Sequence, residues 1–296
     1  MGLKLVLAVL AVQTLAGWTL LAQVHVERSQ DGKVVVTDHE QGGQVVYAPQ
    51  GSVLSWRHKD GWLEVYEPSR NAWMRAPGSF PLVQASGSLV FAFGPGASGS
   101  AVYDASRKAW VQQFNRYNQG AVSETLAVGY GGPGGIGIYD TRTGAWQSPN
   151  ITGDQLALSD SLVALFGGRS TTSVYDSVRG TWKSDIRPFS KCVLGENLVA
   201  FYGPPGTDTQ VYDVDSGHFV LLREAVLSME VFGGLAVGVG DRHRAHVYSS
   251  PDGAWVAFKG EAESARIVDG LVLVTDTARD VWVYRPGKGT FEKTGG

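Results

Sequence analysis

The chain has 296 residues, of which 43% are hydrophobic and 18% are charged, so it is long enough to bury a large core. Its formal net charge of -3 and the absence of a run of lysines and arginines give no support for a nucleic-acid partner or for an anionic membrane surface. The 39 glycines and nine tryptophans favour short strands joined by tight turns over helices.

Residues 1–23 are typical of an export signal. Lys4 precedes a mostly apolar run from Leu5 to Leu21, and the segment contains no acidic residue. The run is also about long enough to span a membrane, so an uncleaved N-terminal anchor remains the alternative and would be the chain's one membrane contact. Cys192 is the single cysteine and cannot form an internal disulfide; we interpret it as a buried apolar residue. We therefore expect an exported bacterial protein that is periplasmic, cell-envelope or extracellular.

A hairpin is predicted directly after this segment, within residues 24–43. Its strands cover residues 24–28 and 33–37 and flank Gln30-Asp31-Gly32, a typical turn sequence. The role of this hairpin depends on the repeats that follow it.

Seven tyrosines recur at intervals of 36 or 37 residues, and each is followed seven residues later by Trp or Phe. The tyrosines are Tyr66, Tyr103, Tyr139, Tyr175, Tyr212, Tyr248 and Tyr284, and the aromatic partners are Trp73, Trp110, Trp146, Trp182, Phe219, Trp255 and Phe291. In five of the seven repeats, a glycine stands five residues after the tyrosine. Asn71 and Lys108 occupy this position in the first two repeats. This spacing predicts a hairpin whose turn requires positive φ, with Lys108 as the exception.

An aspartate directly follows four of the tyrosines, where its carboxylate can accept N–H groups of the same turn; these are Asp104, Asp140, Asp176 and Asp213. An apolar strand precedes each tyrosine from the second repeat on: residues 89–93, 126–130, 162–166, 198–202, 235–239 and 271–275. A shorter strand is predicted before each apolar strand. Each repeat is therefore a four-stranded antiparallel meander, which must pack on the neighbouring repeats.

Seven such meanders predict an all-β fold, a single β-propeller of seven four-stranded antiparallel blades over residues 44–296. Residues 24–43 would then close the ring against the last blade. The alternative is a propeller of eight blades in which the N-terminal hairpin forms half of the eighth.

The glycine pair, tyrosine and tryptophan of two repeats resemble the kelch repeat. The matching stretches run from 166–168 through Tyr175 to Trp182 and from 130–132 through Tyr139 to Trp146. The resemblance covers residues 44–293 and implies a propeller. The other repeats lack the full glycine pair, so the chain is similar to a short, degenerate kelch-like repeat protein.

Few residues point to chemistry. Asp241, His243 and His246 have side chains suited to a transition metal, although polar residues are also expected in a solvated turn. Residues 129–134 read GxGxxG, but a strand follows instead of the helix that a dinucleotide site needs. We identify no catalytic residue and no cofactor-binding residue.

Aromatic residues outside the repeat positions are the better candidates for ligand binding, namely Trp56, Trp62, Tyr117 and Trp282. The repeated tryptophans are expected to fill space between blades. The sequence thus favours a monomeric, non-catalytic binding or scaffold propeller that recognises a protein or glycan partner through loops at the channel mouth. The alternatives are a propeller enzyme acting on glycans, a hydrolase or lyase with loop carboxylates, and a multivalent lectin.

Overall fold

The computed structural model describes residues 62–294 except 152, 168–170 and 204–206, and before residue 62 it describes the strands 24–28, 34–38, 43–47 and 53–59. The expected export segment, residues 1–23, lies outside the described residues. No helix in the described part of the chain is long and apolar enough to cross a membrane.

The described residues form seven antiparallel sheets, which we call blades 1 to 7. Blade 1 contains β1 (Val24–Arg28), β2 (Val34–Asp38), β3 (Gly43–Tyr47), β4 (Val53–Lys59), β5 (Trp62–Glu67) and β6 (Ala72–Arg75), with a 3-10 helix at Pro68–Arg70. Blade 2 contains β7 (Leu82–Ser86), β8 (Leu89–Phe93), β9 (Ser100–Asp104) and β10 (Ala109–Gln113). Blade 3 contains β11 (Gln119–Val122), β12 (Leu126–Gly132), β13 (Gly135–Asp140) and β14 (Ala145–Gln147).

The later blades have the same order of four strands. Blade 4 contains β15 (Gln155–Leu158), β16 (Leu162–Phe166), β17 (Thr172–Asp176) and β18 (Thr181–Asp185). Blade 5 contains β19 (Lys191–Leu194), β20 (Leu198–Tyr202), β21 (Thr209–Asp213) and β22 (His218–Leu222). Blade 6 contains β23 (Val226–Phe232), β24 (Leu235–Gly240), β25 (Ala245–Ser249) and β26 (Ala254–Ala257), and blade 7 contains β27 (Ala262–Val268), β28 (Leu271–Asp276), β29 (Val281–Tyr284) and β30 (Phe291–Lys293).

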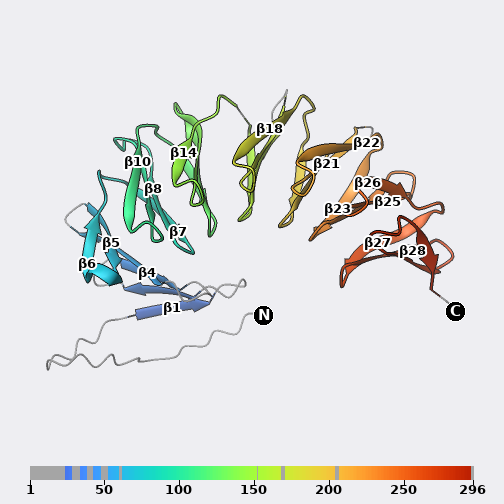
Figure 1. Cartoon of the computed structure of the whole chain (residues 1–296), viewed down its shortest axis with the longest axis horizontal. Coiled ribbons are helices and arrows are strands. Elements are labelled where there is room, and N and C mark those ends of the chain that lie inside the picture. Colours follow the sequence, from blue (N-terminus) through green and yellow to red (C-terminus); the bar gives the residue numbers. More distant parts are fainter. Residues whose placement is uncertain are drawn as a thin grey trace.

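The chain is thus an all-β propeller of seven blades, as the repeats predict, and the six predicted apolar strands are confirmed as β8, β12, β16, β20, β24 and β28. The blades follow one another around an arc, with blades 1 and 7 at its two ends (Figure 1). β7 and β23 lie toward the inside of the arc, and β10 and β14 toward its outside.

The predicted N-terminal hairpin is confirmed as β1 and β2, which pair with each other. β2 also pairs with β3, so the hairpin extends the sheet of blade 1 and does not form a separate eighth blade. Closure of the ring through residues 24–43 stays a prediction.

The turn position five residues after each tyrosine has positive φ in all seven repeats. Its φ values are 48° at Asn71, 53° at Lys108, 65° at Gly144, 66° at Gly180, 72° at Gly217, 62° at Gly253 and 63° at Gly289. The turn prediction is therefore confirmed, and it also holds for Lys108, which was expected to be the exception. The backbone of the hairpin dictates this conformation whichever residue occupies it.

Replacing Gly180 by valine should lower the free energy of unfolding by more than about 1 kcal/mol, because a β-branched residue tolerates positive φ poorly. No other atom lies within 4 Å of a Cβ built at Gly180, so the cost comes from the backbone and not from a clash. Urea unfolding measures it. Gly180→Asn is the matched control and should cost much less, since asparagine occupies the same turn position in blade 1. Equal stability of the valine variant and the parent chain would contradict the turn assignment.

Each blade has two sides that contact different neighbours. The tyrosine side carries the repeated tyrosine and faces the preceding blade, and the leucine side carries the leucine that begins the second strand and faces the following blade. Between blades 2 and 3, for example, Leu89 and Phe91 of blade 2 pack in one cluster with Ala127 and Tyr139 of blade 3. Six such apolar clusters join the seven blades in the described residues. The core of the molecule is therefore a series of junctions between blades.

A hydrogen bond between a buried tyrosine and a carboxylate joins each pair of consecutive blades; we call it the latch. The six tyrosine hydroxyls donate to the carboxylate 32 to 36 residues earlier, on the preceding blade. The pairs are Tyr103–Glu67 (2.6 Å), Tyr139–Asp104 (2.8 Å), Tyr175–Asp140 (2.9 Å), Tyr212–Asp176 (2.8 Å), Tyr248–Asp213 (2.7 Å) and Tyr284–Asp252 (2.5 Å).

The latch carboxylates have two tasks. At Asp213, Oδ1 accepts the N–H of Asp215 (2.9 Å) within the turn, as the sequence predicts. Its Oδ2 accepts the Tyr248 hydroxyl from the next blade, and both residues are completely buried. Burial raises the pKa of all six latch tyrosines above the usual 10.0, and the neighbouring carboxylate raises it further. The tyrosines therefore remain protonated donors.

Candidate functional site

The meander places its loops alternately at two faces of the propeller. The turns between the first and second strands and between the third and fourth strands form one face, the turn face, which includes the latch carboxylates. The loops between the second and third strands, with the links from one blade to the next, form the opposite connection face. Since the repeated residues serve the blades themselves, the loops of the connection face are the better place for a site.

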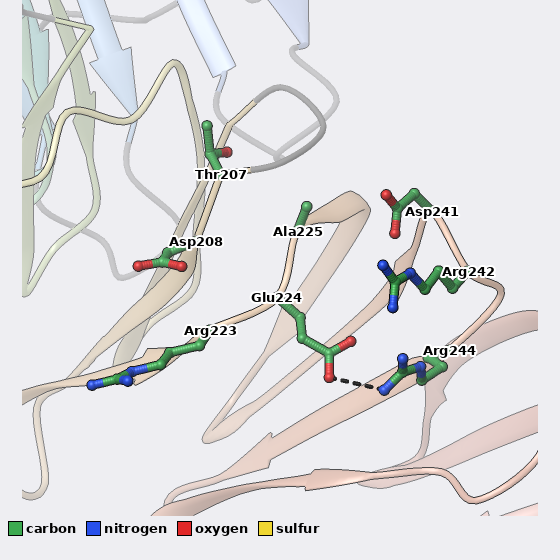
Figure 2. Close-up of a pocket in the computed structure, with 8 residues that line it drawn as sticks. All are labelled: Thr207, Asp208, Arg223, Glu224, Ala225, Asp241, Arg242 and Arg244. Carbon is green, nitrogen blue, oxygen red and sulfur yellow. Dashed lines mark hydrogen bonds and ion pairs between the residues drawn. The ribbon is translucent and has the colours of Figure 1, made fainter.

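A cleft of about 380 Å³ opens on the connection face between blades 5 and 6. Three loops build it: the segment before β21, the link between β22 and β23, and the loop between β24 and β25. Arg242 and Arg244 extend from one side toward Glu224 on the other (Figure 2). The lining residues are Thr207, Asp208, Arg223, Glu224, Ala225, Asp241, Arg242 and Arg244.

Charged side chains of both signs line this cleft, and only some of them are paired with each other. Arg244 donates to Glu224 Oε1 at 3.1 Å, and Glu224 Oε2 lies 3.3 Å from His246 Nε2. Asp208 lies 3.7 Å from Arg187 of blade 4. Arg223 and Arg242 have no ion-pair partner among the described residues.

His246 lies on β25 beside the cleft and is 1% exposed. Burial lowers the pKa of its imidazole, and the nearby Glu224 carboxylate opposes this without reversing it. The imidazole is therefore neutral at neutral pH. Nδ1 has no hydrogen-bond partner within the described part of the chain, and Nε2 has the Glu224 Oε2 atom as its neighbour at 3.3 Å.

The three metal candidates differ in their placement. His246 is buried in a strand, whereas Asp241 and His243 are exposed in the loop before it. His243 has a φ of 55°, a conformation typical of a turn residue. Among residues that the structure describes, no group of three or more His, Cys, Asp or Glu side chains could hold a metal ion. Asp241 and Glu224 instead line the cleft together with arginines.

Three of the four aromatic ligand candidates are placed at separate junctions between blades. Trp56 packs against the apolar cluster between blades 1 and 2, and Tyr117 is completely buried and accepts a hydrogen bond from Gln113 (2.7 Å). Trp282 donates to Asp276 at 2.9 Å and packs edge-on against Phe258. Trp62 is 38% exposed, and the Arg75 guanidinium stacks 5.0 Å from its ring centre. Of these four side chains, Trp62 is the one with a substantially exposed ring.

Four of the five repeated tryptophans pack against the clusters between blades, namely Trp110, Trp146, Trp182 and Trp255; the fifth, Trp73, is 37% exposed. The indole N–H groups of Trp110, Trp146 and Trp255 donate to backbone carbonyls of the preceding blade, at 3.0, 3.1 and 3.2 Å. This arrangement confirms the packing role predicted for them and gives no support to a lectin that stacks sugars on these rings.

Two other sequence features also have structural explanations. Cys192 packs in the cluster between blades 4 and 5, and burial raises the pKa of its thiol, which disfavours a reactive thiolate. The GxGxxG stretch lies in β12 and its turn into β13. Neither feature is part of the cleft.

Sequence reasoning missed the cleft arginines, because nothing in their spacing distinguishes them from solvated loop residues. A partial signal is available in the repeat alignment: Arg223 lies four residues after the repeated aromatic Phe219, a position occupied by Phe114, Ile186 and Lys259 in other blades. This position is exposed in all four blades. Residues that vary at an exposed repeat position are better candidates for binding than residues that recur.

No family model matches the sequence, and a search of curated proteins finds no match either. Solved structures similar to this chain include BamB from Moraxella catarrhalis, with 14% identity over 90% of this chain and 95% of that chain and a TM-score of 0.35. The computationally designed Ika8 protein is 14% identical over 89% of this chain and 96% of that chain, with a TM-score of 0.34. Hsv2 from Kluyveromyces lactis is 13% identical over 86% of this chain and 95% of that chain, with a TM-score of 0.34. Similarities of this size say nothing about the activity of the chain.

Proposed function

We propose that this propeller is an exported, non-catalytic binding scaffold that recognises a protein partner through its connection face. The observation that carries the proposal is the exposure of Phe114 and Ile186, which are 85% and 83% exposed at equivalent positions of blades 2 and 4. An exposed large apolar side chain can serve as an anchor that a protein partner buries. We further propose that the blades are kelch-like.

The chemistry of this face suggests the kind of partner. Phe114 and Ile186 offer apolar contacts, and the same repeat position holds the exposed cations Arg223 and Lys259 in blades 5 and 6. Together with Arg242 of the cleft, these side chains form a row on the connection face that is apolar in blades 2 and 4 and basic in blades 5 and 6. A partner surface with apolar and acidic groups would complement it.

Affinity capture from a bacterial envelope extract tests the proposal. The double variant Phe114→Ser with Ile186→Ser should bind the captured protein at least about tenfold more weakly than the parent chain, as expected for the loss of two anchors. The matched control is Val178→Ser with Phe232→Ser, two side chains that are 57% and 65% exposed on the turn face. Equal loss in both double variants, or binding unchanged in the first, would overturn the connection-face proposal.

A propeller enzyme acting on glycans is the second candidate, and the Glu224–His246 contact of 3.3 Å beside the cleft is the observation in its favour. Turnover of a glycan that is lost in Glu224→Gln, with binding retained, would replace the scaffold proposal by this one. Capture of a glycan without turnover would change the partner class and keep the scaffold role.

Export stays part of the proposal, and cell fractionation of the full chain tests it.

A further inference from the structure

A hydrogen bond between the third strand of a blade and the link to the next blade recurs along the chain. Ser100 Oγ donates to the carbonyl of Asn115 at 2.5 Å in blade 2, and Thr172 Oγ1 donates to the carbonyl of Arg187 at 2.8 Å in blade 4. In both cases the acceptor lies 15 residues after the donor, and the residue that donates is completely buried. The contact seats the link on its own blade.

Blade 5 has the donor for this contact but does not form it. Thr209 holds the same repeat position, three residues before the tyrosine, and is completely buried. The residue 15 positions later is Glu224, yet the Thr209 hydroxyl has no hydrogen-bond partner among the described residues. An unpaired hydroxyl in a buried site is unfavourable. The link of residues 223–225, between β22 and β23, therefore lies off the seat that the repeat provides for it.

The Glu224 side chain holds the link on blade 6 instead. Its Oε1 lies 3.1 Å from Nη1 of Arg244, and its Oε2 lies 3.3 Å from Nε2 of His246. Arg242 extends from the same loop as Arg244 toward the link (Figure 2). All of these residues belong to the stretch 207–294, which is described without a gap. The groups of blade 6 thus form a place for a carboxylate, and a carboxylate of the chain itself fills it.

The contact between Glu224 and Arg244 is open to exchange. The two side chains are 38% and 41% exposed, and an ion pair with this much solvent around it contributes little to stability. When Glu224 leaves, its link can move onto Thr209 and pair the buried hydroxyl, which offsets the lost contact. The link therefore has two seats, and only in the second are the guanidinium groups of blade 6 free.

We propose that Arg242, Arg244 and His246 form a binding site for an acidic side chain of the protein partner, and that Glu224 blocks this site until the partner displaces it. The inference rests on the proposed function, in which the partner brings acidic groups to the connection face. Glu224 competes at a high effective concentration because it belongs to the same chain. The block therefore favours partners that also contact the apolar anchors Phe114 and Ile186.

Urea unfolding tests the two seats without any partner. Thr209→Val keeps the shape of the side chain and removes the unpaired hydroxyl, so it should raise the folding equilibrium constant about threefold in the parent chain. In a Glu224→Ala chain the link sits on Thr209, and the same substitution should lower the constant about tenfold. Thr172→Val breaks a formed hydrogen bond and, as the matched control, should lower the constant in both backgrounds. An effect of Thr209→Val with the same sign in both backgrounds would overturn the second seat.

Calorimetric titration with a hexaglutamate peptide tests the site itself. Glu224→Ala should bind the peptide at least about tenfold more tightly than the parent chain, because the internal competitor is gone. Adding Arg244→Gln should cancel this gain. Glu261→Ala makes the same change in net charge in the link between blades 6 and 7 and, as the matched control, should leave the affinity within about twofold.

Equal gains in Glu224→Ala and Glu261→Ala would show a general attraction by net charge and would overturn the site, as would an absence of peptide binding in every variant. The affinity capture tests the partner and the calorimetry tests the site, so failure of the proposed function is distinguishable from failure of this inference.

Discussion

Replacing Tyr248 by phenylalanine should lower the free energy of unfolding by about 2 kcal/mol, the scale expected for a hydrogen bond to a charged group. The change removes one hydroxyl and keeps the ring that packs between blades 5 and 6. Asp213 Oδ2 would then lose its 2.7 Å donor in a completely buried site. Urea unfolding followed by tryptophan fluorescence measures the loss.

Tyr66→Phe is the matched control for this prediction. Its hydroxyl donates to Asn71 in an exposed contact, so its removal should change the free energy of unfolding by less than about 0.5 kcal/mol. If Tyr248→Phe proved as mild as Tyr66→Phe, the latch would not be a stabilising contact, and the repeated tyrosines would act through their rings alone.

Replacing Gly129 by alanine should destabilise the chain by about 1–3 kcal/mol through overpacking. A Cβ at Gly129 would lie 2.0 Å from Cδ2 and 2.4 Å from Cγ of Tyr117. Gly137, the partner of Gly129 in the β12–β13 ladder, lies on the same ring, where a Cβ would be 2.0 Å from the Tyr117 hydroxyl. The two glycines thus form a slot that admits the buried ring. Thermal and urea unfolding measure the cost.

A second substitution shows whether the ring is the cause. In a Tyr117→Ala chain, which has lost stability through the cavity, Gly129→Ala should add almost no further cost because its Cβ no longer meets the ring. The same additional loss of stability in both backgrounds would show that the alanine acts through the strand backbone. The interpretation of the two glycines as a slot for the ring would then be wrong.

Gly129 also illustrates how a local motif can mislead. The letters GxGxxG match a phosphate-binding pattern, but here their first glycine makes room for Tyr117. The same contact accounts for the placement of Tyr117 itself, which was a ligand candidate because it lies outside the repeat positions. Its burial depends on two glycines 12 and 20 residues away, and no local rule relates them.

The repeat spacing by itself determined the fold class, the number of blades, the second strand of blades 2 to 7 and the positive φ at the hairpin turns. These features depend on periodicity and on the conformation of single residues, both of which are local properties of a chain. The sequence also suggested the turn role of the aspartates, of which Asp213 Oδ1 is an example.

Tertiary structure alone decided the second role of the same carboxylates, because the latch joins residues on different blades and depends on how blades stack. It also decided that Glu224, Arg242 and Arg244 meet in one cleft, since their loops lie outside the repeated positions and carry no periodic signal. Six carboxylates accept tyrosine hydroxyls from the next blade in the described residues, and this second contact is visible only once the blades are seen side by side.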